Sequence, residues 1–212
     1  MATVTTDSAE FAKIVEARHH DPFTVLGRHA VDGQEVIRAY EIKIADTPMT
    51  LTRHPNSDLF EWRGAPGATA TYYQLQWRIN ERLYRAYDPY CFPPQLSDYD
   101  LHLFNEGKHW HAYRILGAHP HTINEISGVL FATWAPNAER VSVVGDFNQW
   151  DGRRHAMRIR GGTGVWELFI PDLEPGTLYK FEIRNRHSGA VFTKSDPYAQ
   201  QFEHRPKTAS IV

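Results

Sequence analysis

The sequence predicts an all-β fold made of two tandem immunoglobulin-like β-sandwiches, with a short helix at the N-terminus. Three observations lead to this prediction. Short runs of β-branched and aromatic residues recur, turn-forming clusters separate them, and an internal repeat relates the two halves of the chain. The length of 212 residues is sufficient for two small domains, each with its own core.

The first predicted element is the N-terminal helix. Asp7 can cap its start, and Glu10, three residues later, can complete a capping box. Phe11, Ile14 and the next residue, Val15, follow at helical spacing and form one apolar face. The helix is expected to end at His-His-Asp-Pro, because a proline disfavours helical backbone in the residue before it.

The rest of the chain is predicted to form strands. Its runs alternate in polarity or are rich in β-branched and aromatic residues, and clusters of Gly, Pro and Asn separate them. The predicted strands are residues 36–44, 59–63, 71–79, 83–86, 128–134, 140–144, 165–170, 178–184 and 190–194. Many short strands with regular turns favour a sandwich over other all-β folds.

An internal repeat organises these strands. Its members occur in the same order in both halves, and the offset grows from 90 residues (26 to 116) to 108 (88 to 196). The matches are Leu-Gly-Arg-His (26–29) with Leu-Gly-Ala-His (116–119), 59–62 with 165–168, 71–75 with 178–181, and Asp-Pro-Tyr (88–90) with Asp-Pro-Tyr (196–198). A duplicated sandwich with insertions in the second copy is the simplest explanation, and chance similarity between β-rich segments is the alternative.

The repeat places a domain boundary between the first Asp-Pro-Tyr and the second Leu-Gly-x-His. Residues 91–96, with two adjacent prolines, resemble an exit linker, and residues 98–106 are interpreted as a strand or bridge into the second domain. The predicted domains are therefore residues 1–105 and 106–212.

Composition excludes several classes of partner. Lys plus Arg total 23 and Asp plus Glu total 25, so the formal net charge is −2 and no basic field favours nucleic acid or an anionic membrane. A single cysteine, Cys91, cannot form an intrachain disulfide, and the N-terminus has no basic region followed by an apolar run. A cytoplasmic protein with a neutral partner is expected.

Aromatic residues make up 13% of the chain, with 6 Trp, 10 Tyr and 11 Phe. Such residues favour strands and fill sheet cores. Their flat rings also form platforms for sugars, whose C–H faces are apolar. Both interpretations can hold at different positions.

The second half carries a specific motif. Residues 131–138 read Phe-Ala-Thr-Trp-Ala-Pro-Asn-Ala, residues 145–153 read Gly-Asp-Phe-Asn-Gln-Trp-Asp-Gly-Arg, and Tyr-Lys-Phe follows at 179–181. This half closely resembles the family 48 carbohydrate-binding module that precedes the catalytic barrel of glycogen branching enzymes. The Trp-Asp-Gly-Arg continuation, the Trp-Ala-Pro-Asn-Ala segment and the Asp-Pro-Phe-x-x-Leu-Gly-x-His motif at 21–29 resemble branching enzymes more than debranching enzymes or kinase glycogen-binding subunits.

The resemblance implies four candidate carbohydrate-binding residues: Trp150, Lys180, Phe192 and Asn148. Trp150 corresponds to the sugar-stacking tryptophan of the module, and packing against a catalytic domain is the alternative. Lys180 corresponds to its sugar-contacting lysine, or is a solvated strand lysine. Phe192 stands where related modules carry a second tryptophan, and it is either a weaker substitute or part of the core. Asn148 belongs to the turn that presents Trp150.

Other aromatic and histidine residues receive structural interpretations. Trp134, Trp166, Phe147 and Phe181 are predicted to be mainly core. Trp62 and Trp77 are predicted to lie in the core or at a domain interface rather than in a sugar site. The 12 histidines include closely spaced pairs at 109/111 and 119/121, yet no cysteine or His-Glu motif accompanies them, which disfavours a zinc site. The histidine of each Leu-Gly-x-His motif is predicted to anchor its sandwich.

The resemblance implies the non-catalytic N-terminal part of a 1,4-α-glucan branching enzyme, which moves an α-1,4-linked chain to a 6-hydroxyl. Its partners would be α-glucan (glycogen, amylose or maltooligosaccharide) and the catalytic barrel, with no metal or organic cofactor. A barrel needs about 250 residues of alternating strand and helix, which this sequence lacks, so no catalytic residue is assigned and the chain is expected to be inactive alone. The alternative is a stand-alone glycogen-binding scaffold protein.

Overall fold

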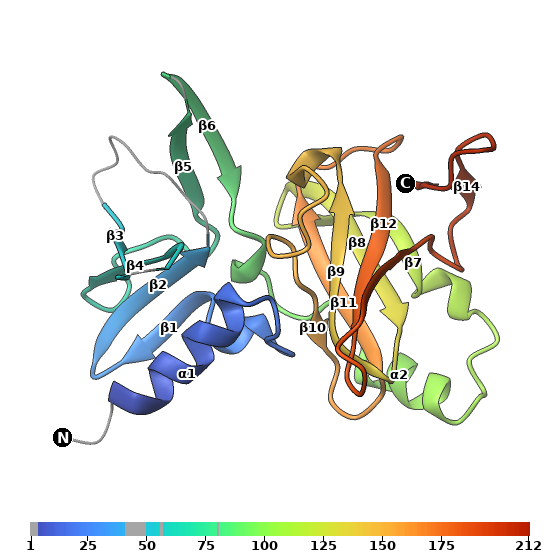
Figure 1. The fold of residues 1–212 in the computed structure, drawn as a ribbon, viewed down its shortest axis with the longest axis horizontal. Coiled ribbons are helices and arrows are strands. Elements are labelled where there is room, and N and C mark those ends of the chain that lie inside the picture. The colour runs from blue at the N-terminus through green and yellow to red at the C-terminus, as the bar shows by residue number, and fades with distance from the viewer. Residues whose placement is uncertain (1–3, 41–49, 56, 80) are drawn as a thin grey trace. The chain divides into compact units, whose positions relative to one another are not determined.

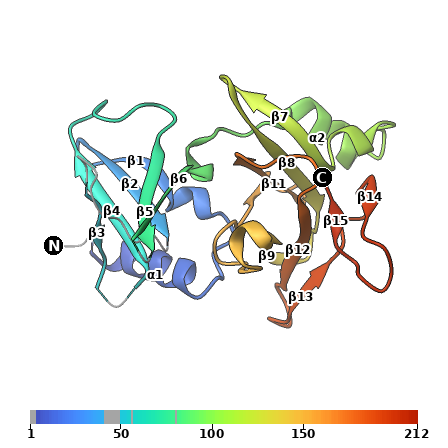
Figure 2. The same ribbon diagram turned by 90° about the horizontal axis from the view of Figure 1, so that it is seen from above.

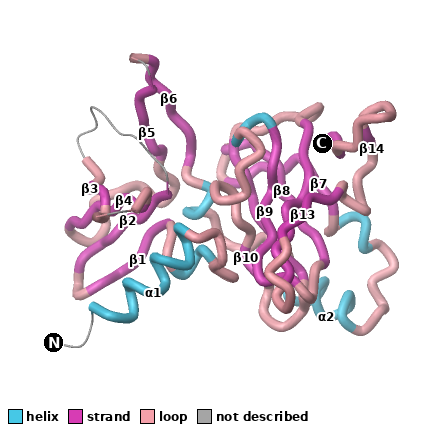
Figure 3. The backbone as a smooth tube through the Cα atoms, in the orientation of Figure 1, coloured by secondary structure: helices cyan, strands magenta, loops and turns pink. Residues whose placement is uncertain are grey.

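The structure, a computed structural model, describes residues 4–40, 50–55, 57–79 and 81–212. The chain divides into two compact units, which we call the N-terminal unit (Met1–Pro93) and the C-terminal unit (Pro94–Val212). Strands predominate in both, with 42% of residues in strands and 14% in helices, as Figure 3 shows by the extent of its magenta segments. The prediction of an all-β fold with a short N-terminal helix is confirmed.

The N-terminal unit combines one helix with two antiparallel sheets (Figure 1). The larger sheet has the strand order β1-β2-β4-β3, and β5 pairs with β6 to form a hairpin. The elements are α1 (Val4–Val15), η1 (Pro22–Thr24), β1 (Gly27–Val31), β2 (Gln34–Tyr40), β3 (Thr52–Arg53), β4 (Leu59–Gly64), β5 (Gln74–Ile79), β6 (Arg82–Tyr87) and η2 (Pro89–Cys91). The predicted strand at residues 36–44 corresponds to β2 as far as residue 40, and its remainder lies outside the described residues.

Helix α1 packs its apolar face on the N-terminal core, where Ile14 joins Leu26 and Leu59. Phe11 is partly buried against the same cluster, so the predicted apolar face is correct. The predicted start is wrong, because α1 begins at Val4 and Asp7 therefore lies within the helix rather than at its cap.

The C-terminal unit is a sandwich of two antiparallel sheets. One sheet has the order β10-β11-β8-β7, and in the other β12 pairs with β9, β13 and β15. Figure 2 shows β7 and β8 on one side of this unit and β12 and β13 on the other. The elements are α2 (Asp98–Asn105), η3 (Ala112–Arg114), β7 (Gly117–Ile123), β8 (Ile126–Trp134), β9 (Ala138–Gly145), η4 (Asp146–Asn148), β10 (Arg158–Ile159), β11 (Val165–Pro171), β12 (Leu178–Asn185), β13 (Val191–Lys194), β14 (Gln201–Phe202) and β15 (Ser210–Ile211).

Large aromatic side chains join the two sheets of this unit. Phe131 on β8 packs edge-on against Tyr179 on β12, with ring centroids 5.0 Å apart, and Tyr179 also contacts Phe181. All three are buried, as is Trp166 on β11. Burying aromatic side chains of this size contributes several kcal/mol each, on the order of 25 cal/mol per Å² of apolar surface, so they dominate this core.

Residues 98–106, interpreted from the sequence as a strand or bridge, form helix α2 instead. The Ser97 hydroxyl accepts a hydrogen bond from the Asp100 backbone N–H at 3.1 Å, which is a helix N-cap. Leu101 is buried on the inner face of the helix. The sequence contains this signal, since a capping serine stands three residues before an acidic residue.

The two units divide at Pro93 rather than near residue 105, because the segment before α2 is tied to the C-terminal unit. The buried carboxylate of Glu167 on β11 accepts hydrogen bonds from the backbone N–H groups of Gln95 (3.1 Å) and Leu96 (2.8 Å). Arg160 completes the connection by donating to the Leu96 carbonyl at 2.7 Å.

The internal repeat corresponds to the same contacts in each unit. In both Leu-Gly-x-His motifs the histidine Nε2 donates to the leucine carbonyl, from His29 to Leu26 at 3.0 Å and from His119 to Leu116 at 2.9 Å. Each histidine therefore closes its own motif, and its role as an anchor of the sandwich stays a prediction.

The Asp-Pro-Tyr motifs also have matching partners. Tyr73 donates its hydroxyl hydrogen to Asp88 at 2.5 Å, and Tyr179 donates to Asp196 at 2.6 Å. Each aspartate also accepts the backbone N–H two residues later, which closes the turn. The glycine of the first Leu-Gly-x-His motif packs on the first Asp-Pro-Tyr motif. Gly27 has φ +85°, and a Cβ on it would lie 2.6 Å from the carbonyl oxygen of Tyr90. These contacts explain why the first and last motifs of each copy recur together.

The duplication extends further upstream than the sequence motifs indicate. His19 pairs with Glu10 of α1 at 2.8 Å, and His109 pairs with Asp100 of α2 at 2.9 Å. Asp100 follows Glu10 by 90 residues, and His109 follows His19 by 90 residues. This is the same offset that separates the two Leu-Gly-x-His motifs. Each copy therefore begins with its helix, which agrees with a division at Pro93.

Candidate functional site

The candidate site centres on the loop that follows β9, residues 146–157. This loop returns along the edge of β9: the Val143 N–H donates to the His155 carbonyl at 3.0 Å, and the Met157 N–H donates to the Val141 carbonyl at 2.8 Å. Both ends of the loop are thus fixed to one strand, and a loop held in this way can present a side chain in a defined position.

Asn148 holds the inside of the loop. Its Oδ1 accepts the Gly145 N–H at 3.0 Å, and its Nδ2 donates to the Val143 carbonyl at 2.8 Å and to His155 Nδ1 at 2.9 Å. Burial, followed by the nearby charge of Arg154, lowers the pKa of His155 to about 4, so the imidazole is neutral and can accept this hydrogen bond.

Only 1% of the Asn148 surface is exposed, and its amide is occupied by these three partners. Asn148 therefore supports the turn that presents Trp150, the place given to it in the sequence analysis, and its role as a carbohydrate-binding residue stays a prediction.

Trp150 is presented outward by this support. Its residue surface is 38% exposed, and its indole Nε1 donates to Asp146 Oδ1 at 2.8 Å. Gln149 and Trp150 both have positive φ, 60° and 59°, a conformation that is costly for residues other than glycine. Two adjacent residues in this conformation turn the chain sharply, and the Asp146 hydrogen bond fixes the orientation of the ring.

The Asp-Gly-Arg residues that follow fasten the loop to the sheet. Asp151 accepts three side-chain hydrogen bonds from Arg153, which together with one from the Arg153 backbone N–H lower the pKa of the Asp151 carboxyl. The Gly152 carbonyl accepts a hydrogen bond from Arg140 on β9. A Cβ at Gly152 would lie 2.0 Å from Glu182 Oε1, so the loop lies directly against the Glu182 side chain of β12, which would have to move to admit a larger residue.

Lys180 lies on the same face of β12 as Glu182, because alternate residues of a strand share a face. Its Nζ donates to Thr208 Oγ1 at 2.7 Å. An ammonium group has three donors, and Thr208 uses one of them. The Gly152 segment of the loop therefore lies against the face of β12 that carries Glu182 and Lys180, and Trp150 belongs to the same loop.

Phe192 lies elsewhere. It pairs with Ile183 across β13 and β12, and directly opposed residues of an antiparallel pair share a face. Ile183 alternates with Glu182, so Phe192 belongs to the opposite face of the sheet from Lys180. Its ring is partly exposed at the edge strand and lies under Lys194, 5.2 Å from the ring centroid. The structure does not bring Phe192 together with the other candidates.

The remaining aromatic predictions divide between core and surface. Trp166 is fully buried and Phe181 nearly so, as predicted. The prediction for Trp134 is wrong, because 54% of this residue is exposed. Trp134 is the last residue of β8, where its indole donates to the Thr163 carbonyl at 3.2 Å and meets Phe104 of α2 edge-on.

The face that carries Trp150 is suited to an uncharged ligand. A flat indole can stack on an apolar C–H face, the Lys180 ammonium can donate to hydroxyl oxygens, and Asp146 and Glu182 carboxylates can accept hydroxyl hydrogens. Within the described residues, no group of three His, Cys, Asp or Glu side chains is arranged to hold a metal ion. No helix in the described ranges is long and apolar enough to cross a membrane.

Two family models match the chain. Residues 7–90 match the N-terminal domain of the alpha-1,4-glucan branching enzyme GlgB, and residues 115–199 match carbohydrate-binding module 48, also described as the isoamylase N-terminal domain. The two matches fall in different structural units, and the candidate site lies within the second.

Curated relatives agree with both models. The chain is 56% identical to the 1,4-alpha-glucan branching enzyme GlgB of Methylococcus capsulatus and 57% identical to that of Nitrosococcus oceani, with 97% of the chain covered in each case. The enzyme of Cellvibrio japonicus is 51% identical over the same share. The chain spans 28–30% of the length of these three relatives.

Among solved structures, pullulanase of Klebsiella pneumoniae complexed with maltotriose overlaps 48% of this chain and 10% of its own, with 24% identity and a TM-score of 0.37. A TM-score of this size does not bear on function. The family models and the curated relatives agree along the chain, which therefore belongs to the N-terminal region of the 1,4-α-glucan branching enzyme family, with the branching-enzyme N-terminal domain followed by carbohydrate-binding module 48.

Proposed function

We propose that this chain holds α-glucan on the face formed by Trp150 and Lys180, as the non-catalytic part of a branching enzyme that converts α-1,4-linked chains into α-1,6 branches. The observation that carries the proposal is the fixed, outward-facing indole of Trp150 on the module 48 unit. A second role is to brace the catalytic barrel of such an enzyme, and the expected location is cytoplasmic.

The chemistry of the face supports an α-glucan ligand. A glucose ring has an apolar face that matches the indole and a rim of hydroxyl groups that matches Lys180 and nearby carboxylates. The net charge of −2 provides no strong attraction for a polyanion. Glycogen, amylose and maltooligosaccharides share the same repeating unit, so all three are proposed ligands.

Bond cleavage is assigned to another part of such an enzyme. Glycoside chemistry needs a pair of carboxylates on either side of the scissile bond. Near Trp150, Asp146 is engaged with the indole and Glu182 is paired with Arg140. These contacts hold both carboxylates in place and leave lone pairs that can accept sugar hydroxyls, which supports binding without catalysis.

The proposal predicts the behaviour of two matched tryptophan variants. Trp150→Ala should raise the Kd for glycogen about tenfold, the equivalent of ~1.4 kcal/mol, because the stacking platform is removed. Trp110→Ala removes an even more exposed indole from the loop between α2 and η3, and should leave the Kd unchanged. Affinity electrophoresis in glycogen-containing gels measures both. Equal retardation of the Trp150 variant and the unmodified chain would move the site elsewhere.

A further inference from the structure

A hollow in the N-terminal unit lies beside its shortest edge strand. Its volume is about 540 Å³, and the lining residues come from β3, β4 and the segments flanking β3. This volume lies within the range of about 300–1,000 Å³ that is typical of small-molecule sites. The lining carries two threonine hydroxyls, a carboxylate, two guanidinium groups and an imidazole, beside one indole and one proline.

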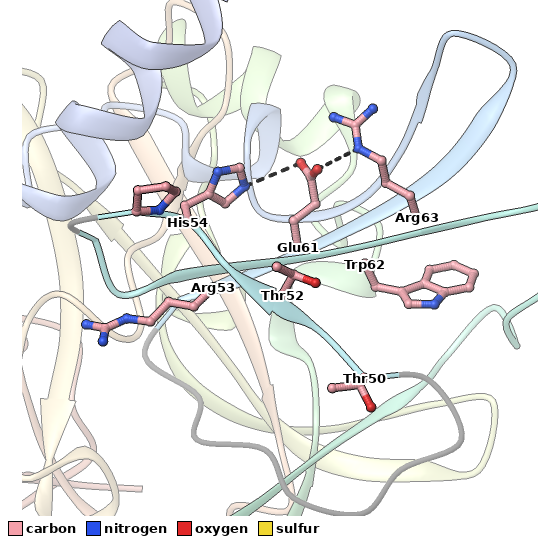
Figure 4. A pocket seen from close by; sticks show the side chains of 8 residues that line it. Thr50, Thr52, Arg53, His54, Glu61, Trp62 and Arg63 are labelled. Carbon is pink, nitrogen blue, oxygen red and sulfur yellow. Dashed lines mark hydrogen bonds and ion pairs between the residues drawn. The ribbon is translucent and has the colours of Figure 1, made fainter.

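The hollow forms where β3 stops. β3 is two residues long and pairs with Phe60 and Glu61 of β4, so in the described structure it does not cover the edge of β4 at Trp62 and Arg63. Side chains from both faces of β4 therefore border the same space. In Figure 4, Glu61, Arg63 and His54 gather on one side, and the Trp62 indole extends away from them.

In the C-terminal unit, the backbone segment at residues 95–96 occupies the corresponding place. Strand β10 pairs with β11 as β3 pairs with β4, which makes Glu167 the counterpart of Glu61 and Arg160 the counterpart of His54. Glu167 binds the backbone N–H groups of Leu96 and the residue before it, and Arg160 binds the Leu96 carbonyl.

Among the described residues of the N-terminal unit, no backbone segment binds Glu61 in this way. At the repeat offset of 90 residues, the positions matching 95 and 96 are 5 and 6, which belong to helix α1 and so cannot form an extended segment. In the described residues, Glu61 accepts only side-chain donors, from Arg38 at 2.6 Å and from Arg63 at 2.6 Å. In the C-terminal unit, the carboxylate of Glu167 therefore binds the chain's own backbone. In the N-terminal unit, the corresponding carboxylate of Glu61 lines a hollow instead.

The polar groups of the hollow are set to bind hydroxyls. Burial would raise the pKa of Glu61, but hydrogen bonds from Arg38 and Arg63 outweigh burial and lower it, so the carboxylate is ionised. A carboxylate has about four lone-pair sites, and these two arginines occupy two. His54 Nε2 is buried without a hydrogen-bond partner among the described residues, since its closest carboxylate oxygen lies 3.6 Å away.

The indole of Trp62 packs directly on Gly64, which has no side chain to displace it. A Cβ on Gly64 would lie 2.2 Å from Trp62 Cη2, so the ring rests directly over the glycine backbone, two residues along the same face of β4. A tryptophan seated in this way offers a flat, oriented surface, as sugar stacking requires.

We propose that this hollow is a second α-glucan site at the open edge of β4, in which Trp62 stacks on one sugar ring on one face of the strand while Glu61, Arg63 and the hydroxyl of Thr52 bind hydroxyl groups of the same glucan chain on the other face. The inference rests on the proposed function, since it takes its ligand class from there. An uncharged sugar fits a lining that combines one apolar platform with directed donors and acceptors. The site would give each unit of the duplicated fold its own contact with glucan.

The test uses the indole N–H signals of the ¹⁵N-labelled chain, one for each of its 6 tryptophans, during titration with maltoheptaose. Tryptophan-to-phenylalanine variants assign the signals. In the unmodified chain, maltoheptaose should cause saturable shifts of the Trp62 indole signal and of the Thr52 backbone amide signal. In Trp62→Ala, the shift of the Thr52 amide should be lost. Trp77→Ala is the matched control, because Trp77 stacks on Tyr84 in the hairpin of the same unit and lies outside the hollow.

Arg63→Ala provides a second variant that does not disturb the core, because the Arg63 side chain is largely exposed. It should weaken binding at the Trp62 signal at least about threefold and leave the Trp150 signal unaffected. Cellohexaose, a β-linked glucan, should give no shift at Trp62 at the same concentrations.

Each pattern of shifts has one meaning. A shift at Trp150 without one at Trp62, at saturating maltoheptaose, overturns the second site and leaves the proposed function intact. A shift at Trp62 alone supports the second site and removes Trp150 from the proposed function. No shift at either residue refutes both.

Discussion

Replacing Asn148 with alanine tests whether Asn148 supports the binding loop while Trp150 contacts the ligand. The side chain makes three hydrogen bonds, to Gly145, Val143 and His155, all shielded from water. Asn148→Ala leaves these three groups without the amide, and each buried group left unsatisfied costs about 1–3 kcal/mol. Allowing for partial rehydration, the C-terminal unit should lose about 3–5 kcal/mol of unfolding free energy, a large part of a domain's total stability.

Trp150→Ala is the matched comparison. Its side chain is partly exposed and makes one hydrogen bond, to the exposed Asp146, so the loss of unfolding free energy should be about 1 kcal/mol or less. Both variants should bind glycogen more weakly, one because the loop is no longer supported and the other because the platform is gone. Only the asparagine variant should also be strongly destabilised.

Urea titration followed by two-dimensional NMR measures the two effects separately. Backbone amide signals of Val143 and Phe181 report the C-terminal unit, and those of Val36 report the N-terminal unit, which should unfold at an unchanged urea concentration. If Asn148→Ala keeps the unmodified midpoint for Val143 and still loses glycogen binding, then Asn148 touches the ligand directly and its assignment as a support is wrong.

Two further predictions concern buried carboxylates. Burial raises the pKa of Asp88 from 3.8 to about 6, although Tyr73 donates to it, so the folded state binds this proton more tightly than the unfolded state. The contribution of Asp88 to the free energy of unfolding therefore rises as pH falls. Relative to Asp88→Asn, the unmodified chain should gain about 2 kcal/mol of unfolding free energy between pH 7 and pH 4.5, as measured by urea unfolding. The same pH dependence in both proteins would contradict the raised pKa of Asp88. Glu167→Ala should release the segment before α2 and leave the largely buried Arg160 with only the exposed carboxylate of Asp98, at a cost of about 3 kcal/mol. Amide exchange of Leu96 should then accelerate at least about 100-fold, and unchanged protection of that amide would show that the segment is held by other contacts.

The parts of the fold that could be predicted from sequence depend on local interactions. The Leu-Gly-x-His and Asp-Pro-Tyr motifs contain both the turn residues and their immediate hydrogen-bond partners, such as His119 with Leu116 and Asp196 with the Tyr198 N–H. Alternating polarity likewise located the strands that bury Phe131 and Phe181. These signals lie within a few residues of each other, so a single sequence contains them.

The parts that could not be predicted depend on contacts between distant residues. The boundary at Pro93 follows from Glu167 binding Leu96, 71 residues away. The burial of Asn148 depends on His155 folding back over it, and the separation of Phe192 from Lys180 depends on strand register. Motif matching assigned these residues to one group because it could not place them on faces of a sheet.

Helix α2 was missed for a different reason. Its window is short and polar, with a single buried residue, Leu101, so hydrophobic periodicity gives little signal. The cap formed by Ser97 and the Asp100 N–H was the available evidence. Trp134 was predicted to be core because it lies in a strand or strand-end pattern, although the last residue of a strand can extend beyond the opposite sheet.

The most direct test of the central claim is a crystal structure of the chain with maltoheptaose bound. The account predicts a glucose ring stacked on the Trp150 indole, about 4 Å from it, with a hydroxyl oxygen within hydrogen-bond distance of Lys180 Nζ. Glucan density that avoids the face formed by Trp150 and Lys180, in a crystal where no neighbouring molecule covers it, would contradict the account.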